Sequence, residues 1–515
     1  MKIILNNVKV PVIHNFEDVI RASQEKIHDL DNIRIYKKSI DARRKNDIHY
    51  VYSVVGDTNR NIEIFKDVTP YRETERVELD TPLSDKKIVI VGMGPCGLFA
   101  GLILAQHGYK PVILERGEDV DSRHRTIKNS QNNSTINPQS NIQFGEGGAG
   151  TFSDGKLTTR IGDPMQKFVL ETFVKFGAPE EILYLSKPHI GTDLLRGIIK
   201  NIREEIISLG GEVKFNSFVK DIGFIDKKVA FVETDEEKID CDSVILAIGH
   251  SSRDTYEMLN KKGVVMEAKP FAAGVRIEHK RDFINFSQYG EFAKENILPT
   301  ADYKLTFNGN RNCFSFCMCP GGSVVNASSE EGMICVNGMS EHARMADNSN
   351  SAIVVNVRPE DFNNNPMEGI EFQRKYEKLA FMQGGGDYSA PVQLAKDFLK
   401  NKLSKGFEDV NPSFNGNTKF ADLRKCLPDF IVNGLCEGLT DFNRKIKGYT
   451  DCGSVLTGVE MRTSAPLRIV RTEIGEAQGF HGLFPAGEGA GYAGGIMSAA
   501  IDGIKSAVKV STYLK

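Results

Sequence analysis

The chain has 515 residues, of which 40% are hydrophobic and 26% are charged, as is usual for a globular protein of two to four domains. Its 65 basic residues nearly balance its 68 acidic ones, so the formal net charge at pH 7 is −3. This balance gives no electrostatic reason to expect DNA or a membrane as a partner. Nine cysteines without a C-x-x-C pair favour reduced thiols, and we predict no metal site. The opening MKIILNNVKV is too short and polar for a signal peptide, so the expected compartment is the cytoplasm.

Residues 1–80 are predicted to form a separate small α+β domain with βαββ order. The expected strands are 2–12, 33–37 and 48–55, and the expected helix is 16–30. The polar stretch 67–87 has no sustained period and is the expected linker. A basic run, KKSIDARRK at residues 37–45, favours a solvated hairpin over an RNA or partner contact.

Residues 88–117, IVIVGMGPCGLFAGLILAQHGYKPVILERG, have the pattern of strand, glycine turn, helix and strand. Each glycine of the G-x-G-x-x-G motif meets a separate steric demand. Gly92 allows the tight turn, Gly94 lets the backbone approach a pyrophosphate, and Gly97 lets helix and strand pack closely.

The helix after this turn begins near Pro95 and points its unpaired N–H groups and positive dipole end at the pyrophosphate. Glu115 follows Gly97 by 18 residues, near the spacing at which an acidic side chain binds an adenosine ribose. Residues 88–106 are mostly apolar, but their glycines and proline argue against a membrane span. The segment therefore predicts a dinucleotide site.

The remainder of the chain repeats elements of a nucleotide-binding fold at long intervals. A strand ends in Ala-Ile-Gly at 247–249, and residues 482–507 return to strand, glycine turn and helix. This order favours an FAD domain assembled from separated segments. Residues 260–449 are mixed in period and are the expected substrate or cap domain. Further predicted elements are helices at about 164–176 and 192–209 and strands at 212–219, 228–234 and 243–248.

The motifs VGMGPCG, FGEGGAGTFSDGKL, ILAIGHSSRD, VEMRTSAPLRI and PAGEGAGYAGGIMSAAIDG resemble those of the uncharacterised FAD-dependent dehydrogenases of bacteria. These proteins fall within the glutathione-reductase-like class of flavoproteins. The resemblance implies an α/β fold with a Rossmann-type FAD domain and an inserted α+β cap. The expected boundaries are 85–160, 205–255 and 450–515 for the FAD domain, and 161–204 and 260–449 for the cap.

The resemblance also implies a role for individual residues in binding FAD. Glu115 would bind the adenosine ribose, Arg116 would lie at the adenine end, and Val219 would offer its backbone to the adenine. Glu488 stands where related proteins place an aspartate that binds a ribityl hydroxyl. The positions expected to contact the cofactor are Gly92, Gly94, Pro95, Cys96, Gly97, Glu115, Arg116, Gly145, Gly147, Gly148, Val219, Ala247, Gly249, Gly487, Glu488, Gly494, Gly495 and Ile496.

A flavin accepts a hydride without a protein nucleophile, so the catalytic candidates are proton donors and substrate anchors. His342 and Arg344 in MSEHARM would act as proton relay and carboxylate anchor, in competition with ordinary surface or ion-pair roles. Arg276 in GVRIEH is a candidate for which a cross-sheet ion pair is at least as good an interpretation. Weaker candidates are His189, Arg462 and Arg468.

Cys313, Cys317 and Cys319 fall short of the four ligands that an iron–sulfur cluster needs. Cys317 is the candidate for a reactive thiol facing the flavin, with a buried inert cysteine as the competing interpretation. Cys96 has no cysteine two or five residues away, which disfavours the familiar disulfide-reductase chemistry of flavoproteins.

We therefore expect an FAD-dependent oxidoreductase that moves a hydride between bound FAD and a small organic substrate. NAD(P)H would be a transient electron donor in the same pocket, because no second dinucleotide fingerprint is present. An electron-carrier protein is the other expected partner. Two alternatives stay open: an FAD-dependent hydroxylase, and an RNA-modifying flavoprotein that binds RNA through residues 1–80.

Overall fold

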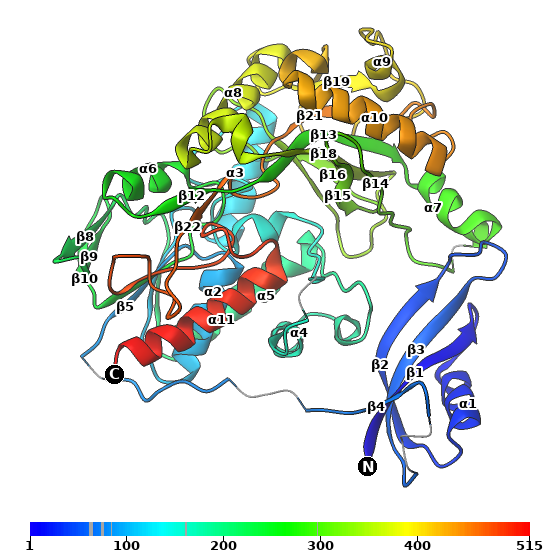
Figure 1. Cartoon of the computed structure of the whole chain (residues 1–515), viewed down its shortest axis with the longest axis horizontal. Coiled ribbons are helices and arrows are strands. Elements are labelled where there is room, and N and C mark those ends of the chain that lie inside the picture. Colours follow the sequence, from blue (N-terminus) through cyan, green and yellow to red (C-terminus); the bar gives the residue numbers. More distant parts are fainter. Residues whose placement is uncertain (61–64, 74–76, 84, 160–161, 296) are drawn as a thin grey trace.

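The computed structural model describes residues 1–60, 65–73, 77–83, 85–159, 162–295 and 297–515. Three parts are visible in Figure 1: a small N-terminal domain at one side, a parallel-sheet domain that contains the C-terminal helix, and a domain of sheet and helices above them. The expected linker, residues 67–87, runs between the first two parts, but its residues 68–70 pair with the N-terminal sheet as an edge strand. Four further residues of this stretch, 74–76 and 84, lie outside the described residues.

The N-terminal domain is a four-stranded sheet with strand order β2-β3-β1-β4, covered by α1. Its elements are β1 (Lys2–Pro11), α1 (Phe16–Lys26), β2 (Asp31–Asp41), β3 (His49–Asp57) and β4 (Val68–Pro70). The expected βαββ order is present, with β4 as an additional edge strand. The helix ends before the expected residue 30 because Ile27 is extended, with φ −137°, which lets Ile27 and Leu30 enter the core.

The second domain is built on a five-stranded parallel sheet with strand order β23-β11-β5-β6-β7. These strands are β5 (Ile88–Val91), β6 (Val112–Leu114), β7 (Glu212–Lys214), β11 (Ser243–Leu246) and β23 (Leu483–Pro485). They come from three separated regions of the sequence and all run parallel. Consequently the glycine turn after β5, the Ala-Ile-Gly turn after β11 and the turn after β23 all lie at one edge of the sheet.

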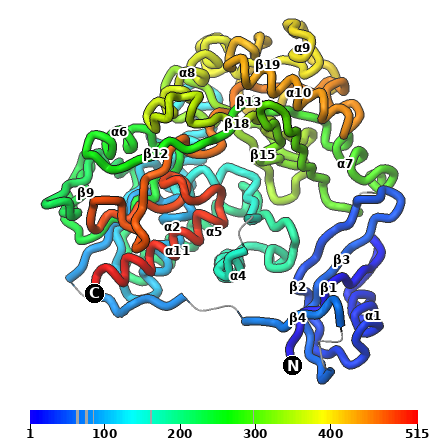
Figure 2. Tube along the Cα trace, in the orientation of Figure 1, coloured from blue at the N-terminus to red at the C-terminus, as the bar shows by residue number. Residues whose placement is uncertain are grey.

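One face of this sheet is covered by a layer of helices, of which α2 (Pro95–Gln106) is buried almost all round. α2 packs on α11 (Ile496–Tyr513), the traces of the two helices lie in the same part of Figure 2, and a Cβ atom on Gly503 would clash with the Cys96 backbone. Residues 161–204, expected in the cap domain, instead supply α4 (Met165–Lys175) and α5 (Thr192–Ser208) to this layer. The reason is that their apolar faces complete the core around α2 and α11.

The third domain contains a seven-stranded sheet with order β14-β15-β18-β13-β21-β19-β20. The strands are β13 (Phe271–Lys280), β14 (Thr306–Phe307), β15 (Cys313–Cys319), β18 (Asn348–Val357), β19 (Ala390–Leu394), β20 (Thr418–Phe420) and β21 (Val455–Glu460). Its helices are α7 (Arg281–Tyr289), α8 (Pro366–Gly384), α9 (Ala395–Leu399) and α10 (Asp429–Lys445). β21 falls in a segment expected in the FAD domain, but it pairs with β13 and β19 inside this sheet.

Smaller elements complete the two larger domains. They are α3 (Val120–Asn133), β8 (Asp221–Ile225), β9 (Lys228–Glu233), β10 (Lys238–Asp240), α6 (Arg253–Lys261), β12 (Met266–Ala268), β16 (Ser323–Asn326), β17 (Val336–Met339) and β22 (Leu467–Ile469). Among the described residues, no helix has the length and apolarity that crossing a membrane requires. The same residues contain no cluster of three or more His, Cys, Asp or Glu side chains fit to hold a metal ion.

Candidate functional site

A large cavity runs from the carboxyl edge of the parallel sheet to the underside of the seven-stranded sheet. It encloses about 1460 Å³ of space free of protein atoms, including its open mouth. Both domains line it, so the cavity joins the glycine turn after β5 to the ends of β15 and β21.

The glycine turn after β5 is tightly packed on one side and open on the other. A Cβ on Gly92 would lie 2.5 Å from the Ala247 carbonyl oxygen, and one on Gly97 would lie 1.9 Å from the Gly92 oxygen. By contrast, a Cβ on Gly94 would meet only the Gly148 Cα, at 3.8 Å, and would point into the cavity. Among the described residues no side chain caps the N-terminus of α2 at Gly94, which leaves that helix end available to an anion.

Glu115 at the end of β6 ties the glycine turn to the loop 145–150. Its carboxylate is 4% exposed and accepts backbone hydrogen bonds from Met93 at 2.8 Å, Gly145 at 2.9 Å and Gly117 at 3.0 Å. A carboxylate has about four acceptor positions, so one remains for a hydroxyl in the cavity. The side chain therefore has a structural role beside the expected contact with ribose.

Arg116 forms a flat, charged wall at the same end of the cavity. Its guanidinium carbon lies 4.1 Å from the centre of the Phe144 ring and 4.4 Å from that of Phe218. The guanidinium also makes two hydrogen bonds with the Asp254 carboxylate, at 3.1 and 2.6 Å. Val219 lines the cavity next to this stack.

The loop 145–150 is held in place by a fully buried arginine. Arg123 donates hydrogen bonds to the carbonyl oxygens of Asn141, Ile142 and Glu146 at 2.7 to 3.0 Å. The Gly147 amide donates to the Met93 carbonyl at 2.8 Å, which brings Gly148 beside the glycine turn.

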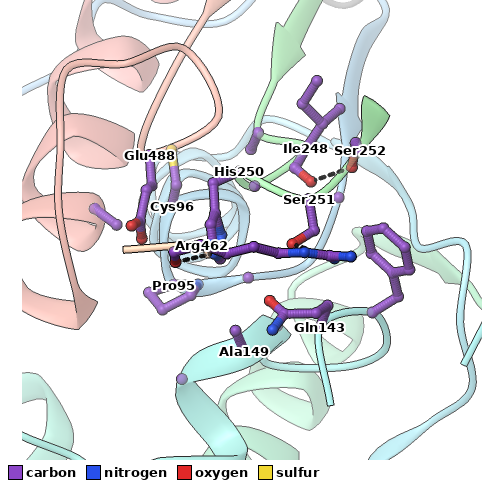
Figure 3. Close-up of a pocket in the computed structure, with 18 of the residues that line it drawn as sticks. Pro95, Cys96, Gln143, Ala149, Ile248, His250, Ser251, Ser252, Arg462 and Glu488 are labelled. Carbon is purple, nitrogen blue, oxygen red and sulfur yellow. Dashed lines mark hydrogen bonds between the residues drawn. The ribbon is translucent and has the colours of Figure 1, made fainter. Parts of the chain in front are cut away.

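The turn between β23 and α11 forms the opposite end of this cradle. The Gly487 amide donates to Asp502 at 2.7 Å, and Glu488 lines the cavity while its carboxylate accepts from the Gly495 amide at 3.4 Å. In Figure 3, Glu488 and Cys96 lie on the same side of the cavity. Cβ atoms on Gly249, Gly494 and Gly495 would have no heavy atom within 4 Å. This bare backbone fits an elongated dinucleotide that is held by main-chain groups.

Most of the residues expected to bind the cofactor line this cavity. Those in the lining are Gly92, Gly94, Pro95, Cys96, Glu115, Arg116, Gly148, Val219, Ala247, Gly249, Glu488, Gly495 and Ile496. The others, Gly97, Gly145, Gly147, Gly487 and Gly494, are in the same turns but outside the lining. Gly97 and Gly147 act instead through close packing, since Cβ atoms there would clash at 1.9 and 2.1 Å.

The far wall of the cavity carries a charged pair. The Lys156 ammonium lies 3.4 Å from the Asp154 carboxylate and also donates a hydrogen bond to the Met318 carbonyl. Burial opposes ionisation of Asp154, but Lys156 and Arg344 lower the pKa of its carboxyl below the usual value. Arg344 reaches Asp154 with its Nε at 3.0 Å and is not part of the lining. Arg344 therefore holds the Asp154 carboxylate in place from outside the cavity.

Arg276 lies one layer behind the same wall. Its side chain is fully buried and bonds to Glu460 at 2.6 Å, to Asn337 at 3.0 Å and to the Cys317 carbonyl at 3.3 Å. Glu460, Asn337 and Cys317 line the cavity, whereas Arg276 does not. Burial raises the pKa of Glu460 while Arg276 opposes that change. The contacts of Arg276 are therefore those of an ion-pair residue that links neighbouring strands.

A buried ionic network joins the two domains above the cavity. Glu377 accepts bidentate hydrogen bonds from Arg462 at 2.6 and 2.8 Å and from Arg253 at 2.7 and 3.0 Å. Burial would raise the pKa of Glu377, but the two arginines lower it to about 2. Arg462 lines the cavity, and Figure 3 shows its guanidinium pointing towards Ser251 and its carbonyl bonded to His250.

The histidine candidates lie elsewhere. His342 contacts the Ile190 carbonyl at 3.0 Å and stacks on His189 with ring centroids 5.2 Å apart. Neither ring belongs to the cavity lining. Burial, followed by the charge of Arg344, lowers the pKa of His189 to about 4. The structure therefore does not bring together the expected relay of His342 and Arg344 with the nucleotide cradle.

Several lining residues were not singled out from the sequence. They include Gln143, Lys156, Asn337, Glu460 and Thr463. Lys156 follows the glycine loop by six residues in the motif SDGKL, which is a usable signal for a side chain near the cofactor. Asn337 and Glu460 come from ordinary strand sequences, β17 and β21, and reach the cavity through long-range pairing.

Comparisons with solved structures give distant fold likenesses. CtdE in complex with FAD is 11% identical, with a TM-score of 0.33, over 83% of this chain and 87% of that chain. Glycine oxidase from Bacillus cereus is 11% identical, with a TM-score of 0.34, over 83% and 97%. Scores this low carry no argument about the reaction.

Family comparisons are more informative. The pyridine nucleotide-disulphide oxidoreductase family matches residues 86–286, and the family described as FAD-dependent protein, C-terminal domain-like, matches residues 270–463. A domain of unknown function matches residues 4–55. The cofactor is FAD. An uncharacterised protein of Clostridium beijerinckii is 49% identical over 526 residues, covering 98% of each chain. The chain belongs to the FAD-dependent oxidoreductase family that it shares with this Clostridium protein.

Proposed function

We propose that the protein is a dehydrogenase or reductase that moves a hydride between bound FAD and a small organic molecule. The observation that carries this proposal is the single cavity joining the nucleotide cradle to a polar wall under the seven-stranded sheet. FAD supplies a ring system that accepts or donates a hydride. The protein must therefore bind the substrate, orient it against that ring and exchange protons with it. A glutathione-reductase-like FAD domain with an inserted cap is the arrangement that the proposal assumes.

In this proposal the cradle binds FAD along its length. Gly94 and the free N-terminus of α2 hold the pyrophosphate, and Glu115 holds the adenosine ribose. The stack of Arg116 with two phenylalanines holds the adenine end. Glu488 accepts from a ribityl hydroxyl, and the N-terminus of α11 stabilises negative charge on the reduced ring.

The substrate end is the wall formed by Lys156, Asn337 and Glu460. Burial opposes the charge of Lys156, but Asp154 raises its pKa, so the ammonium stays charged and suits an anionic substrate group. Burial raises the pKa of Glu460 while Arg276 opposes that change, so its carboxyl holds a proton more readily than an exposed glutamate and suits a group that exchanges a proton with a substrate. NAD(P)H or an electron-carrier protein would supply or remove electrons through the same opening.

Anaerobic reduction of the purified holoprotein tests the proposal. NADH, NADPH and reduced carriers are offered in turn, followed by a panel of small organic acids and carbonyl compounds, with the flavin absorbance as readout. Lys156→Met should slow turnover with an anionic substrate about tenfold or more, while the matched surface variant Lys187→Met should not. Lys187 pairs with Asp302 at 2.7 Å, away from the cavity lining.

Two outcomes would replace the proposal with an alternative. Rapid reoxidation by oxygen through a stabilised peroxyflavin would indicate a hydroxylase. Salt-dependent RNA binding that weakens on changing Arg43 and Arg44 would indicate an RNA-modifying flavoprotein.

A further inference from the structure

The edge of the cavity at β15 has an irregular backbone. Phe316 pairs with Ala352 and Cys319 pairs with Asn350, so Cys317 and Met318 together stand opposite one residue of β18. Cys317 has φ +42°, a left-handed conformation that is uncommon for residues other than glycine. As a result Cys317 lines the cavity, while Cys319, fully buried, lies directly behind it.

The two cysteines of this bulge are in contact. The Cys319 thiol donates to the Cys317 carbonyl at 3.3 Å. A hydrogen bond between the two side chains also has the largest effect on the pKa of each thiol, lowering that of Cys317 and raising that of Cys319.

Two cations flank the same tripeptide. Lys156 donates to the Met318 carbonyl from the cavity wall. Arg276 donates to the Cys317 carbonyl at 3.3 Å and lies 3.8 Å from the Cys319 sulfur on the buried side. Positive charge close to a thiol favours its ionised, nucleophilic form.

All nine cysteines lie in the described part of the chain, and Cys317 differs from the other eight in the direction in which its surroundings shift the thiol pKa. The Cys319 hydrogen bond, with the charges of Lys156 and Arg276, holds the pKa of Cys317 well below its usual range despite burial. The Cys317 hydrogen bond and burial raise the pKa of Cys319. For Cys313 and Cys335, burial raises the pKa to values of an inert thiol. A thiolate beside a thiol is the reactive arrangement for disulfide formation.

We propose that Cys317 and Cys319 form a dithiol–disulfide centre that exchanges two electrons with bound FAD, and this inference rests on the proposed function. In the oxidative direction the Cys317 thiolate and the Cys319 thiol form a sulfur–sulfur bond. They give up two electrons and the Cys319 proton, which FAD takes up to become its singly protonated, anionic reduced form. The reverse step regenerates the thiolate and the thiol.

The centre would make the protein a four-electron enzyme, with one pair of electrons on FAD and one on the cysteines. It is separate from Cys96 in the glycine turn, whose pKa burial raises well above its usual value. The cysteine centre therefore lies at a bulge of β15 in the seven-stranded sheet and not in the glycine turn after β5.

Reductive titration of the aerobically purified holoprotein tests this centre. Under anaerobic conditions, dithionite should deliver four electrons per FAD to the native protein and two to Cys317→Ser or Cys319→Ser. The matched control Cys452→Ser, a half-buried cysteine outside the cavity lining, should still take up four. Uptake of two electrons by the native protein would overturn the inference.

Peptide mass mapping of the native protein gives a second, independent readout that needs no variant. After aerobic purification the peptide with Cys317 and Cys319 should resist alkylation and be lighter by two hydrogen atoms, and anaerobic reduction should restore both alkylation sites. Free thiols at both positions before reduction would refute the centre. A protein without FAD would refute the proposed function, whereas a protein with FAD and a two-electron titration would refute the cysteine centre alone.

Discussion

Replacing Gly94 with alanine should separate cofactor binding from folding. The new Cβ would meet only the Gly148 Cα at 3.8 Å, and the backbone at Gly94, with φ −69°, suits alanine. The folded protein without FAD should therefore keep its stability to within about 1 kcal/mol. The methyl group would stand where the pyrophosphate approaches the main chain, and it should weaken the hydrogen bonds donated there.

The size of the effect follows from those hydrogen bonds. Each hydrogen bond to a charged group contributes about 1.5–3 kcal/mol, so losing one should weaken FAD binding roughly 10- to 100-fold. At a fixed excess of FAD this would remove about 1.4–2.7 kcal/mol of cofactor-dependent stabilisation. The matched variant Gly97→Ala should behave differently, because its Cβ would lie 1.9 Å from the Gly92 oxygen. That clash should destabilise the protein by about 1–3 kcal/mol or more even without FAD.

The assay combines FAD titration by quenching of flavin fluorescence with urea unfolding of the cofactor-free and cofactor-bound proteins. Gly94→Ala should bind FAD weakly and unfold at the normal urea concentration, whereas Gly97→Ala should be less stable even without FAD. Unchanged FAD affinity in Gly94→Ala would refute the placement of the pyrophosphate. Equal loss of stability in both variants would refute the packing argument.

Three further predictions concern the buried network and the cavity wall. Glu377→Gln removes the carboxylate that binds Arg253 and Arg462 in bidentate fashion and leaves them Glu330, so urea unfolding should show a loss of about 3 kcal/mol, and an unchanged midpoint would contradict this. The pKa of Glu377 is lowered from 4.5 to about 2 in the native protein, so its ionised form stabilises the native state above pH 4.5. This contribution to the free energy of unfolding, about 3 kcal/mol, should disappear as the pH falls from 4.5 through 2. The pH dependence of stability should be flatter over that window in the glutamine variant. His342→Ala should change flavin reduction by less than about threefold, whereas Lys156→Met should slow it more, because only Lys156 lines the cavity; the opposite order would restore the histidine as a catalytic group.

The nucleotide cradle was predictable because its signals are local. Gly92, Gly94 and Gly97 follow a strand and begin a helix within ten residues. The motif that requires glycine at each of these positions is therefore visible in one short segment of the sequence. The turn at Glu488 was predictable for the same reason, since strand, glycine turn and helix are again consecutive.

The wall opposite the cradle depends on pairing between distant segments. Cys317 and Glu460 lie close because β15 and β21 belong to one sheet, and Lys156 joins them by donating to the Met318 carbonyl of β15, although about 300 residues separate Lys156 from Glu460. The helices α4 and α5 illustrate a second limit. Their amphipathic pattern shows that they cover an apolar surface, but it does not show which domain that surface belongs to.

The most direct test of the account is an anaerobic spectral titration of the native holoprotein combined with cofactor extraction. The account predicts one FAD per chain that a hydride donor reduces and a small organic acceptor reoxidises in the absence of oxygen. A protein that carries no FAD, or a flavin that only oxygen reoxidises, would contradict the assignment of the cavity to hydride exchange between FAD and substrate.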